Sequence, residues 1–221
     1  MPAAIPAVPR SEIAPAPEAA IASAREAART APTLEALRAL LENFDGCALK
    51  NTATRLVFAD GNPQARIMFV GEAPGRDEDI EGLPFVGRSG KLLDRMIAAI
   101  GLDRSSAYIA NVIPWRPPGN RTPTPQETQI CLPFIQRQIE LVNPDVLVTL
   151  GNPSTQTLLS TREGIMRTRG QMVRLRHRHA HDPRHRHVPS GLSAALAVLQ
   201  ADVVAGSARD REGAGAGSSS S

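Results

Sequence analysis

Two short segments of the chain combine glycine, carboxylate and amide residues in an order that suits a ligand site. In the first, Gly71-Glu72-Ala73-Pro74-Gly75 precedes an acidic run from Asp77 to Asp79 and the segment Gly82-Leu83-Pro84-Phe85-Val86-Gly87. Glycine lets backbone approach a ligand closely, and carboxylates at a strand end can orient a water or hold a cation. Taken alone, this composition is more typical of a tight turn beside a solvated acidic loop.

In the second segment, Asn111 follows an apolar run and precedes Pro114-Trp115-Arg116-Pro117-Pro118-Gly119-Asn120-Arg121. An asparagine at a strand end can present its amide bidentately to the edge of a nucleobase. Its commoner role is an Asx turn that satisfies its own backbone. The two segments together, rather than either alone, therefore indicate a binding site.

Three short apolar runs, alternating with helical periodicities, must position these residues. Such runs are typical of strands buried on both faces, and their alternation with helices predicts an α/β domain with a parallel sheet. Ligands bind at the carboxyl ends of such strands, where both segments begin. The predicted strands are residues 66–70, 107–113 and 145–150, and the predicted helices are residues 33–41, 90–100 and 125–142.

In this order the motifs resemble those of family 4 uracil-DNA glycosylases. The shared landmarks are Gly-Glu-Ala-Pro-Gly, Gly-x-Pro-Phe-Val-Gly, Tyr-Ile-x-Asn, Arg-Pro-Pro-x-Asn-Arg and a strand ending in Leu-Gly, and they extend from about Cys47 to Gly170. The resemblance implies a three-layer α/β/α fold with a short central parallel sheet. It also implies a DNA-repair enzyme that hydrolyses the N-glycosidic bond of uracil after flipping the base out of the helix.

The resemblance further implies which residues bind uracil. Phe85 would stack on the uracil ring, and the amide of Asn111 would pair with its polar edge and discriminate it from cytosine. Gly71 and Ala73 complete the expected uracil-binding set. The expected partner is uracil-containing DNA.

Three further residues form the expected catalytic group: Glu72, Glu78 and Asn120 would shape the loop and place the attacking water. In the family, a histidine in a late His-Pro-x-x-Leu-Leu motif, after a fourth strand, stabilises the departing uracil anion. No segment of this chain matches that motif in frame. We therefore expect the fourth strand to be lost or disordered and the activity to be impaired.

Enzymes of family 4 resemble one another in holding a 4Fe-4S cluster with four cysteines, whereas this chain has two cysteines in all. Cys47 and Cys131 are the remaining family positions and hence the candidate metal ligands. Lys50 and Trp115 stand at the other two positions, and neither residue type is a normal ligand of such a cluster. We therefore expect no bound cofactor.

Composition and charge limit the remaining possibilities. The 221 residues suit one domain with tails, and no apolar run is long enough to span a bilayer. Prolines interrupt the first twenty residues where a signal peptide would need an apolar stretch, so the sequence predicts a cytoplasmic protein. We expect this protein to be a monomer. The predicted regions are a disordered Ala/Pro-rich leader (1–32), the glycosylase-like domain (33–170) and a His/Arg-rich, then Gly/Ser-rich, tail (171–221).

The tail carries the whole net charge of +3 and all five histidines, so composition does not indicate a basic DNA-binding surface on the domain. It also suggests a shifted reading frame. Displaced by one nucleotide, Arg184 to Ser193 can encode A-I-A-T-F-H-P-A-Y-L, an apolar strand followed by the missing motif. We infer a single-nucleotide slip near Gly170 or Gln171 and expect the tail as written to be disordered.

Two alternatives to a glycosylase remain open. The chain can be a remnant that binds uracil or DNA without cleaving it. It can also bind metal or nucleic acid through its His/Arg-rich tail.

Overall fold

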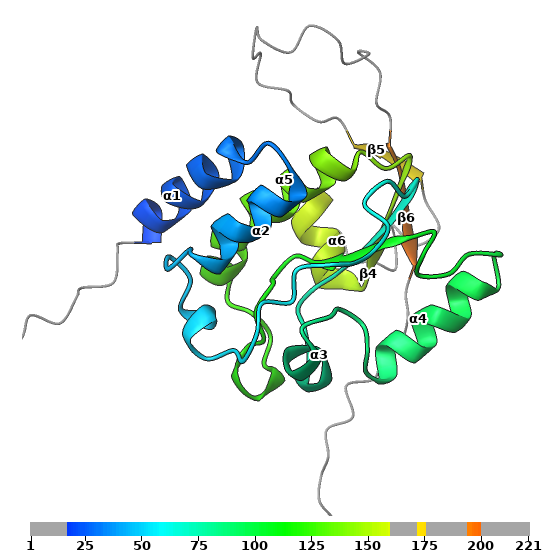
Figure 1. Cartoon of the computed structure of the whole chain (residues 1–221), viewed down its shortest axis with the longest axis horizontal. Coiled ribbons are helices and arrows are strands. Elements are labelled where there is room, and N and C mark those ends of the chain that lie inside the picture. Colours follow the sequence, from blue (N-terminus) through cyan, green and yellow to red (C-terminus); the bar gives the residue numbers. More distant parts are fainter. Residues whose placement is uncertain (1–16, 160–171, 176–193, 200–221) are drawn as a thin grey trace, which may run out of the picture.

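The computed structural model describes residues 17–159, 172–175 and 194–199, which form an α/β protein around one sheet (Figure 1). Four central strands, β3, β2, β4 and β6, are parallel, while β1 and β5 pair antiparallel at the two edges. The strands, in their order across the sheet, are β1 (Asp60–Gly61), β3 (Tyr108–Asn111), β2 (Ile67–Gly71), β4 (Val146–Leu150), β6 (Ala194–Leu199) and β5 (Met172–Leu175).

The three predicted strands are confirmed as β2, β3 and β4. Strand β3 ends at Asn111, two residues before the predicted end at Ile113. The chain nevertheless stays paired beyond β3, because the N–H groups of Val112 and Ile113 donate to the carbonyls of Gly71 and Glu72 at 2.9 Å each. These bonds tie together the two segments that carry most of the predicted site residues.

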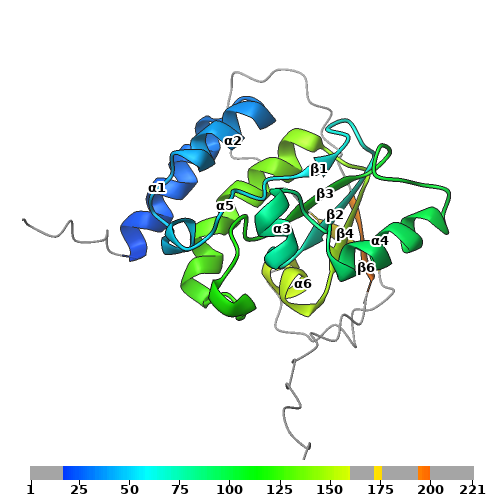
Figure 2. The same ribbon diagram turned by 60° about the horizontal axis from the view of Figure 1, so that its bottom comes forward.

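Alternating side chains of the strands bury two apolar layers, one on each face of the sheet. Met68 and Val70 of β2 pack toward α1, α2 and α5, whereas Phe69 packs toward α4. Figures 1 and 2 show these two sets of helices on opposite sides of the sheet, so the predicted three-layer α/β/α arrangement is confirmed. The helices are α1 (Pro17–Thr30), α2 (Leu34–Glu42), α3 (Arg76–Glu81), α4 (Arg88–Ala98), α5 (Pro125–Val142) and α6 (Asn152–Leu159), with short 3₁₀ turns at Ala48–Asn51 and Pro118–Asn120.

Part of the predicted disordered leader is a helix. Residues Pro17–Thr30 form α1, which packs on α5. Ala20, Ala24 and Ala28 recur at the four-residue spacing that places side chains on one helix face, and all three are buried. Their small size permits close helix packing, which compositional reasoning from Ala and Pro content overlooked.

The expected loss of the fourth strand is also wrong. Strand β6 pairs in parallel with β4, from Val146 opposite Ala195 to Leu150 opposite Leu199. Without a neighbour, this edge of β4 would expose unpaired backbone groups, and the apolar run 194–199 pairs with them instead. The histidine segment 177–187 lies outside the described residues.

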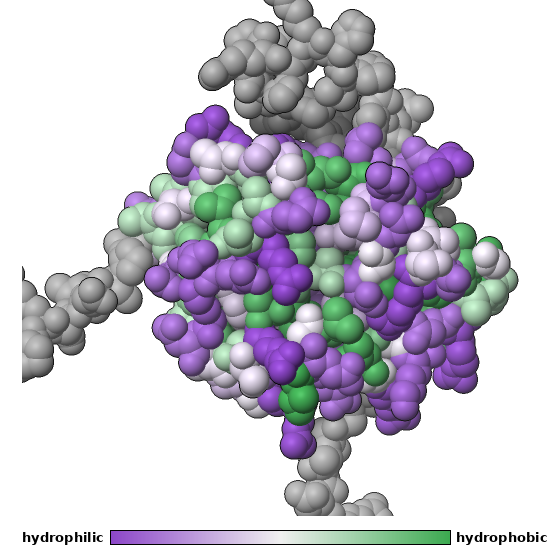
Figure 3. All heavy atoms as spheres, viewed as in Figure 1, coloured by the Kyte–Doolittle hydropathy of each residue, from purple (hydrophilic) through white to green (hydrophobic). Residues whose placement is uncertain are grey.

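The face seen in Figure 3 is mainly hydrophilic, with separate apolar patches between the polar residues. The large apolar side chains exposed among the described residues are Ile80, Leu83 and Ile100. In the described parts of the chain, no helix is both long and apolar enough to cross a lipid bilayer.

Candidate active site

The candidate site lies where two neighbouring parallel strands end. Gly71 closes β2, Asn111 closes β3, and the two residues are opposite one another in the strand register. Strand β2 has β3 on one side and β4 on the other, so the direction of winding changes at β2. This change of direction is where α/β sheets open a crevice for a ligand beyond the strand ends.

Three of the predicted uracil-binding residues converge at this point. A Cβ atom on Gly71 would stand 2.5 Å from Oδ1 of Asn111 and 2.5 Å from Cζ of the Phe85 ring. Any side chain at position 71 would therefore collide with both groups. Because Gly71 has no side chain, the Asn111 amide and the Phe85 ring can both lie against its backbone.

Asn111 is buried, with 5% of its surface exposed. Its Oδ1 atom has no hydrogen-bond partner, and it is the sole buried side-chain nitrogen or oxygen in that condition among the described residues. An unpaired buried acceptor costs about 1–3 kcal/mol. It is therefore an acceptor available to a donor that the described protein does not supply, and it is not used in an Asx turn.

Phe85 adopts a left-handed backbone conformation with φ of 56°. Such a conformation is uncommon for a bulky side chain and costs of order 1–3 kcal/mol. Its ring is partly buried against the layer that contains Phe69 and Ile109. The turn that contains Phe85 is held by hydrogen bonds from other segments of the chain.

Glu78 is one of the groups that hold this turn. Its Oε1 accepts the N–H groups of Val86 (3.1 Å) and Gly87 (2.9 Å), and its Oε2 accepts the N–H of Gly75 (3.1 Å). The residue as a whole is 9% exposed, so the carboxylate meets these three donors in a buried position. Glu78 therefore joins the Phe85 turn to the loop after β2, and this geometry favours shaping the loop over handling water.

Glu72 and Ala73 follow Gly71 directly. Glu72 is half-buried, and this burial raises the pKa of its carboxyl group above the usual value because removal from water disfavours the charged form. Ala73 is partly buried against the layer that faces α5. Glu72 is therefore a carboxyl group at the strand end that can accept a proton at higher pH than an exposed glutamate.

Asn120 lies in the exposed turn after β3 rather than in the buried cluster. Its φ is 56°, and its Oδ1 accepts a hydrogen bond from Nε of Arg116 at 2.6 Å. Nη1 of Arg116 also lies 4.0 Å from the buried Asp79. Arg116 thus connects the Asn120 turn to α3.

Two further charged residues lie near the site: Asp79, which belongs to the acidic run noted in the sequence, and Arg104, which the sequence analysis missed. The Asp79 carboxylate accepts the backbone N–H groups of Thr54 (2.7 Å) and Arg55 (3.2 Å) and the Thr54 hydroxyl (2.9 Å), which fixes α3 to the preceding loop. Arg104 donates to the carbonyl of Phe85. Arg104 is a lone charged residue in a turn, so the sequence around it carries no spacing signal.

The two candidate metal ligands meet in the core. Sγ of Cys131 lies 3.9 Å from Sγ of Cys47, and both residues are buried. The pKa of the Cys131 thiol is raised well above its usual value, because its hydrogen bond to Cys47 and its burial both favour the protonated form. The same hydrogen bond lowers the pKa of the Cys47 thiol, so within this buried pair Cys131 is the thiol that keeps its proton and donates the hydrogen bond to Cys47.

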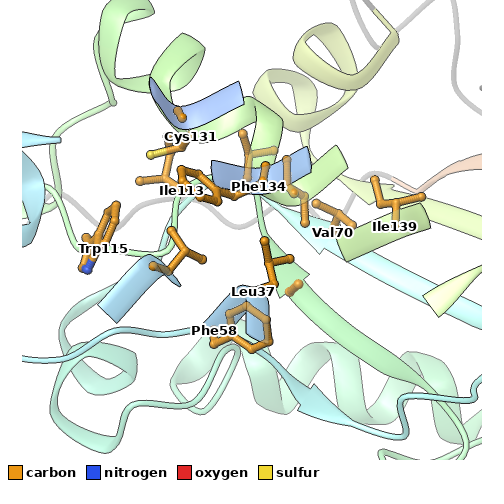
Figure 4. Close-up of a cluster of buried hydrophobic side chains, with 14 of the residues drawn as sticks. Leu37, Phe58, Val70, Ile113, Trp115, Cys131, Phe134 and Ile139 are labelled. Carbon is orange, nitrogen blue, oxygen red and sulfur yellow. The ribbon is translucent and has the colours of Figure 1, made fainter. Parts of the chain in front are cut away.

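The other two cluster positions do not supply ligands. Trp115 is 2% exposed and lies with Ile113 and Cys131 in the buried apolar cluster (Figure 4). Nζ of Lys50 forms an ion pair with Asp45 at 2.6 Å. Within the described segments, no group of three or more histidine, cysteine or acidic residues is arranged to hold a metal ion. The described residues do not fit a four-iron cluster.

Comparison with known proteins relates the chain to a family. The model of the uracil DNA glycosylase superfamily matches residues 58–200. Over 114 residues the chain is 51% identical to the type-4 uracil-DNA glycosylase of Archaeoglobus fulgidus, an alignment covering 52% of this chain and 57% of that protein. The type-4 enzymes of Sulfurisphaera tokodaii and Thermotoga maritima are each 46% identical over 129 and 118 residues. These alignments cover 58% and 53% of this chain and 59% and 62% of the two relatives, so the chain spans little more than half of their length.

Proposed function

Because the chain belongs to the uracil-DNA glycosylase superfamily, we propose that it excises uracil from DNA. In this reaction the bond between C1′ of the deoxyribose and N1 of uracil breaks. Water supplies a hydroxyl group to C1′, and a proton neutralises the departing uracil anion. The relatives named as type-4 uracil-DNA glycosylases support this assignment. We expect the protein to act as a monomer in the cytoplasm.

The observation that carries the proposal is the unpartnered, buried Oδ1 of Asn111 beside the Phe85 ring. Uracil presents an N3–H donor between two carbonyls, so Oδ1 can accept from N3 while the amide nitrogen donates to a carbonyl. Cytosine presents an unprotonated N3, which would face the Oδ1 acceptor without a hydrogen bond. The amide is therefore suited to uracil and rejects cytosine by polarity.

Phe85 and Gly71 supply the rest of the base site. The ring offers a flat apolar face on which a flipped base stacks, a contact worth about 1–3 kcal/mol in nucleic-acid complexes. Gly71 keeps the space beside this ring open. The extruded base would thus exchange its stacking in the duplex for stacking on Phe85.

Glu72 is the residue we assign to the attacking water. Its carboxyl group follows Gly71 directly and is half-buried, which suits a group that orients a water and accepts its proton. Glu78 would act by fixing the two loops, and Asn120 by shaping the turn to which it binds Arg116. These roles agree with the contacts that each side chain makes.

Stabilisation of the uracil anion is the weakest part of this site. All five histidines fall between residues 177 and 187, so the domain from 33 to 170 contains none. Loss of one donor to a developing anion costs about 10²–10³ in rate. We therefore propose that excision by this chain is slow.

The same observation favours a second candidate, a protein that binds uracil in DNA without cleaving it. Stacking on Phe85 and pairing with Asn111 need no anion-stabilising donor. Binding would then persist where turnover is absent. The two candidates differ in chemistry and share one base site.

We also propose that the protein holds no four-iron cluster. Two thiols, an indole and a paired ammonium group stand at the four positions. The apolar packing around Trp115 supports this proposal.

The test is excision from an oligonucleotide with one uracil, followed by strand cleavage at the abasic site. Slow excision is expected, with Phe85→Leu reducing it by about 5-fold or more because the stacking face is lost. Asn111→Asp should lose the preference for uracil over cytosine, while Asn51→Asp, an exposed control, should keep it. Binding without any abasic product would select the second candidate. A protein that neither binds the oligonucleotide nor forms the abasic product would refute both candidates.

A further inference from the structure

Arg104 lies between three segments that surround Phe85. Its Nε donates to Oδ1 of Asp94 (2.8 Å), and its Nη1 donates to Oδ2 of Asp60 (2.6 Å). Nη1 also donates to the carbonyl of Pro84 (3.2 Å), and Nη2 donates to the carbonyl of Phe85. One side chain thus connects α4, β1 and the turn that presents the aromatic ring.

Two carboxylates orient this guanidinium. The Arg104 side chain is 27% exposed, so its ion pairs are partly shielded from water. Burial alone would lower the pKa of Arg104, but hydrogen bonds to Asp60 and Asp94 raise it above its usual value. The charged group is therefore held in place before it reaches the carbonyls of the turn, and charged hydrogen bonds are roughly twice as strong as neutral ones.

The backbone of Phe85 requires such support. Its left-handed conformation is unfavourable, and the direction of its Cα–Cβ bond, hence of the ring, follows from that conformation. Gly90 of α4 meets the Phe85 carbonyl from a second side, since a Cβ there would stand 1.6 Å from the oxygen. The hydrogen bond from Arg104 and the close packing of Gly90 together fix the position of the Phe85 carbonyl.

From these contacts we infer that Arg104 is a positioning residue, which holds the Pro84–Phe85 backbone so that the Phe85 ring stays beside Asn111. The effect on uracil recognition rests on the proposed function, whereas the effect on the Phe85 conformation does not. Lysine cannot replace Arg104, because a single ammonium lacks the planar fork that reaches two carboxylates and two carbonyls at once.

The first test measures Phe85 directly, without any substrate. 4-Fluorophenylalanine at position 85 should give one sharp ¹⁹F resonance in the otherwise unchanged protein. Arg104→Met and Arg104→Lys should broaden or shift it toward the value of an exposed ring. Arg95→Met, which removes an exposed arginine from α4, should leave it unchanged. An unaltered resonance in folded Arg104→Met would overturn the inference.

The second test is a double-mutant cycle on binding to DNA that carries 2′-deoxypseudouridine, in which uracil is joined to the sugar by a carbon–carbon bond that cannot be hydrolysed. Arg104→Met should weaken binding by about 5-fold or more in the parent, a loss typical of residues that act through one another. In the Phe85→Ala background the same substitution should weaken binding by less than about 2-fold. Equal losses in both backgrounds would show that Arg104 does not act through Phe85.

A milder variant guards against loss of folding. Asp94→Asn removes one of the two carboxylates from the Arg104 guanidinium at a position whose side chain is 46% exposed. It should shift the same resonance in the same direction by a smaller amount, and no shift would contradict the inference. If the parent protein fails to bind the pseudouridine DNA, the proposed function fails, and the ¹⁹F spectra still decide the role of Arg104.

Discussion

Gly90 lies directly against the backbone carbonyl of Phe85, so closely that a Cβ on Gly90 would stand 1.6 Å from the oxygen and 2.2 Å from the carbonyl carbon. The first turn of α4 and the turn that presents the ring are therefore packed backbone to backbone. This contact makes the orientation of the aromatic ring depend on a residue that cannot itself touch the base.

Gly90→Ala should impair the site more than its small size suggests. The added methyl group must displace the Phe85 backbone or the start of α4, and overpacking of this kind costs about 1–3 kcal/mol. Denaturant unfolding should report this loss, and uracil-DNA binding should fall with it. Ser89→Ala, one residue earlier in α4, is the matched control. Unchanged stability and binding in Gly90→Ala would show that the contact is not maintained in solution.

Glu72→Gln should separate catalysis from stability. If the carboxylate positions the water, its loss should slow excision by about 10²-fold or more. Because the folded-state pKa is raised, the stability contributed by protonated Glu72 is complete below the ordinary pKa and is lost as pH rises through the raised value. The variant, which stays neutral, should therefore be more stable than the parent at neutral pH and equal to it in acid.

The pH profile gives the same residue an independent check. Excision by the parent should decline on the acid side with a midpoint above the ordinary pKa of glutamate, and this limb should be missing in Glu72→Gln. Glu81→Gln on α3, where the side chain is exposed, should retain the limb. A parent profile that is flat down to the ordinary pKa would remove Glu72 from the reaction.

The protein purified without oxygen should be colourless and contain neither iron nor sulfide in stoichiometric amounts. Two thiols cannot hold a four-iron cluster, because such a cluster is bound by four thiolate ligands. Elemental analysis and visible absorption are the measurements. The variant Lys50→Cys/Trp115→Cys, with four thiols, is the positive control. A brown parent protein with bound iron would contradict the expectation.

The reading frame after Gly170 should determine the rate of excision. A protein encoded with a one-nucleotide shift at this point would regain the His-Pro motif and should excise uracil about 10²–10³-fold faster. Since β6 already pairs with β4 in the chain as written, this edge of β4 is covered. We therefore do not expect an unpaired sheet edge to make the chain as written less soluble than the frame-shifted protein. Equal rates would remove the functional consequence of the slip, and sequencing of the gene across 162–182 tests the slip itself.

The parts of the fold that sequence reasoning predicted are those with a local signal. The runs that became β2, β3 and β4 are apolar and end at glycine, asparagine or leucine-glycine, and Thr124 precedes α5 as a cap whose Oγ1 accepts the N–H of Glu127 at 3.2 Å. The segment of α1 was expected to be at most transiently helical, over 18–30, within a flexible leader, because its buried face consists of alanine, which contributes little to an apolar pattern. β6 was missed because the inferred frame shift led us to expect no regular structure in the tail.

The site was predictable to the extent that it lies on motifs. Gly71, Phe85 and Asn111 come together as their motifs implied, whereas Asn120 lies in an exposed turn. Arg104 could not be found in this way, because its partners lie 10, 19, 20 and 44 residues away along the chain. Only the folded chain brings these separated carboxylates and carbonyls to one guanidinium group.

The two-residue strand β1 has a consequence for how the protein behaves at high concentration. Asp60 and Gly61 cover the outer edge of β3 over only two positions, and a Cβ at Gly61 would stand 2.1 Å from the carbonyl of Ala107. Gly61, with φ of 94°, turns the chain sharply at this point. A strand this short and bent offers no template on which a second molecule can add its own strand, so this edge resists the stacking from chain to chain that leads to fibrils.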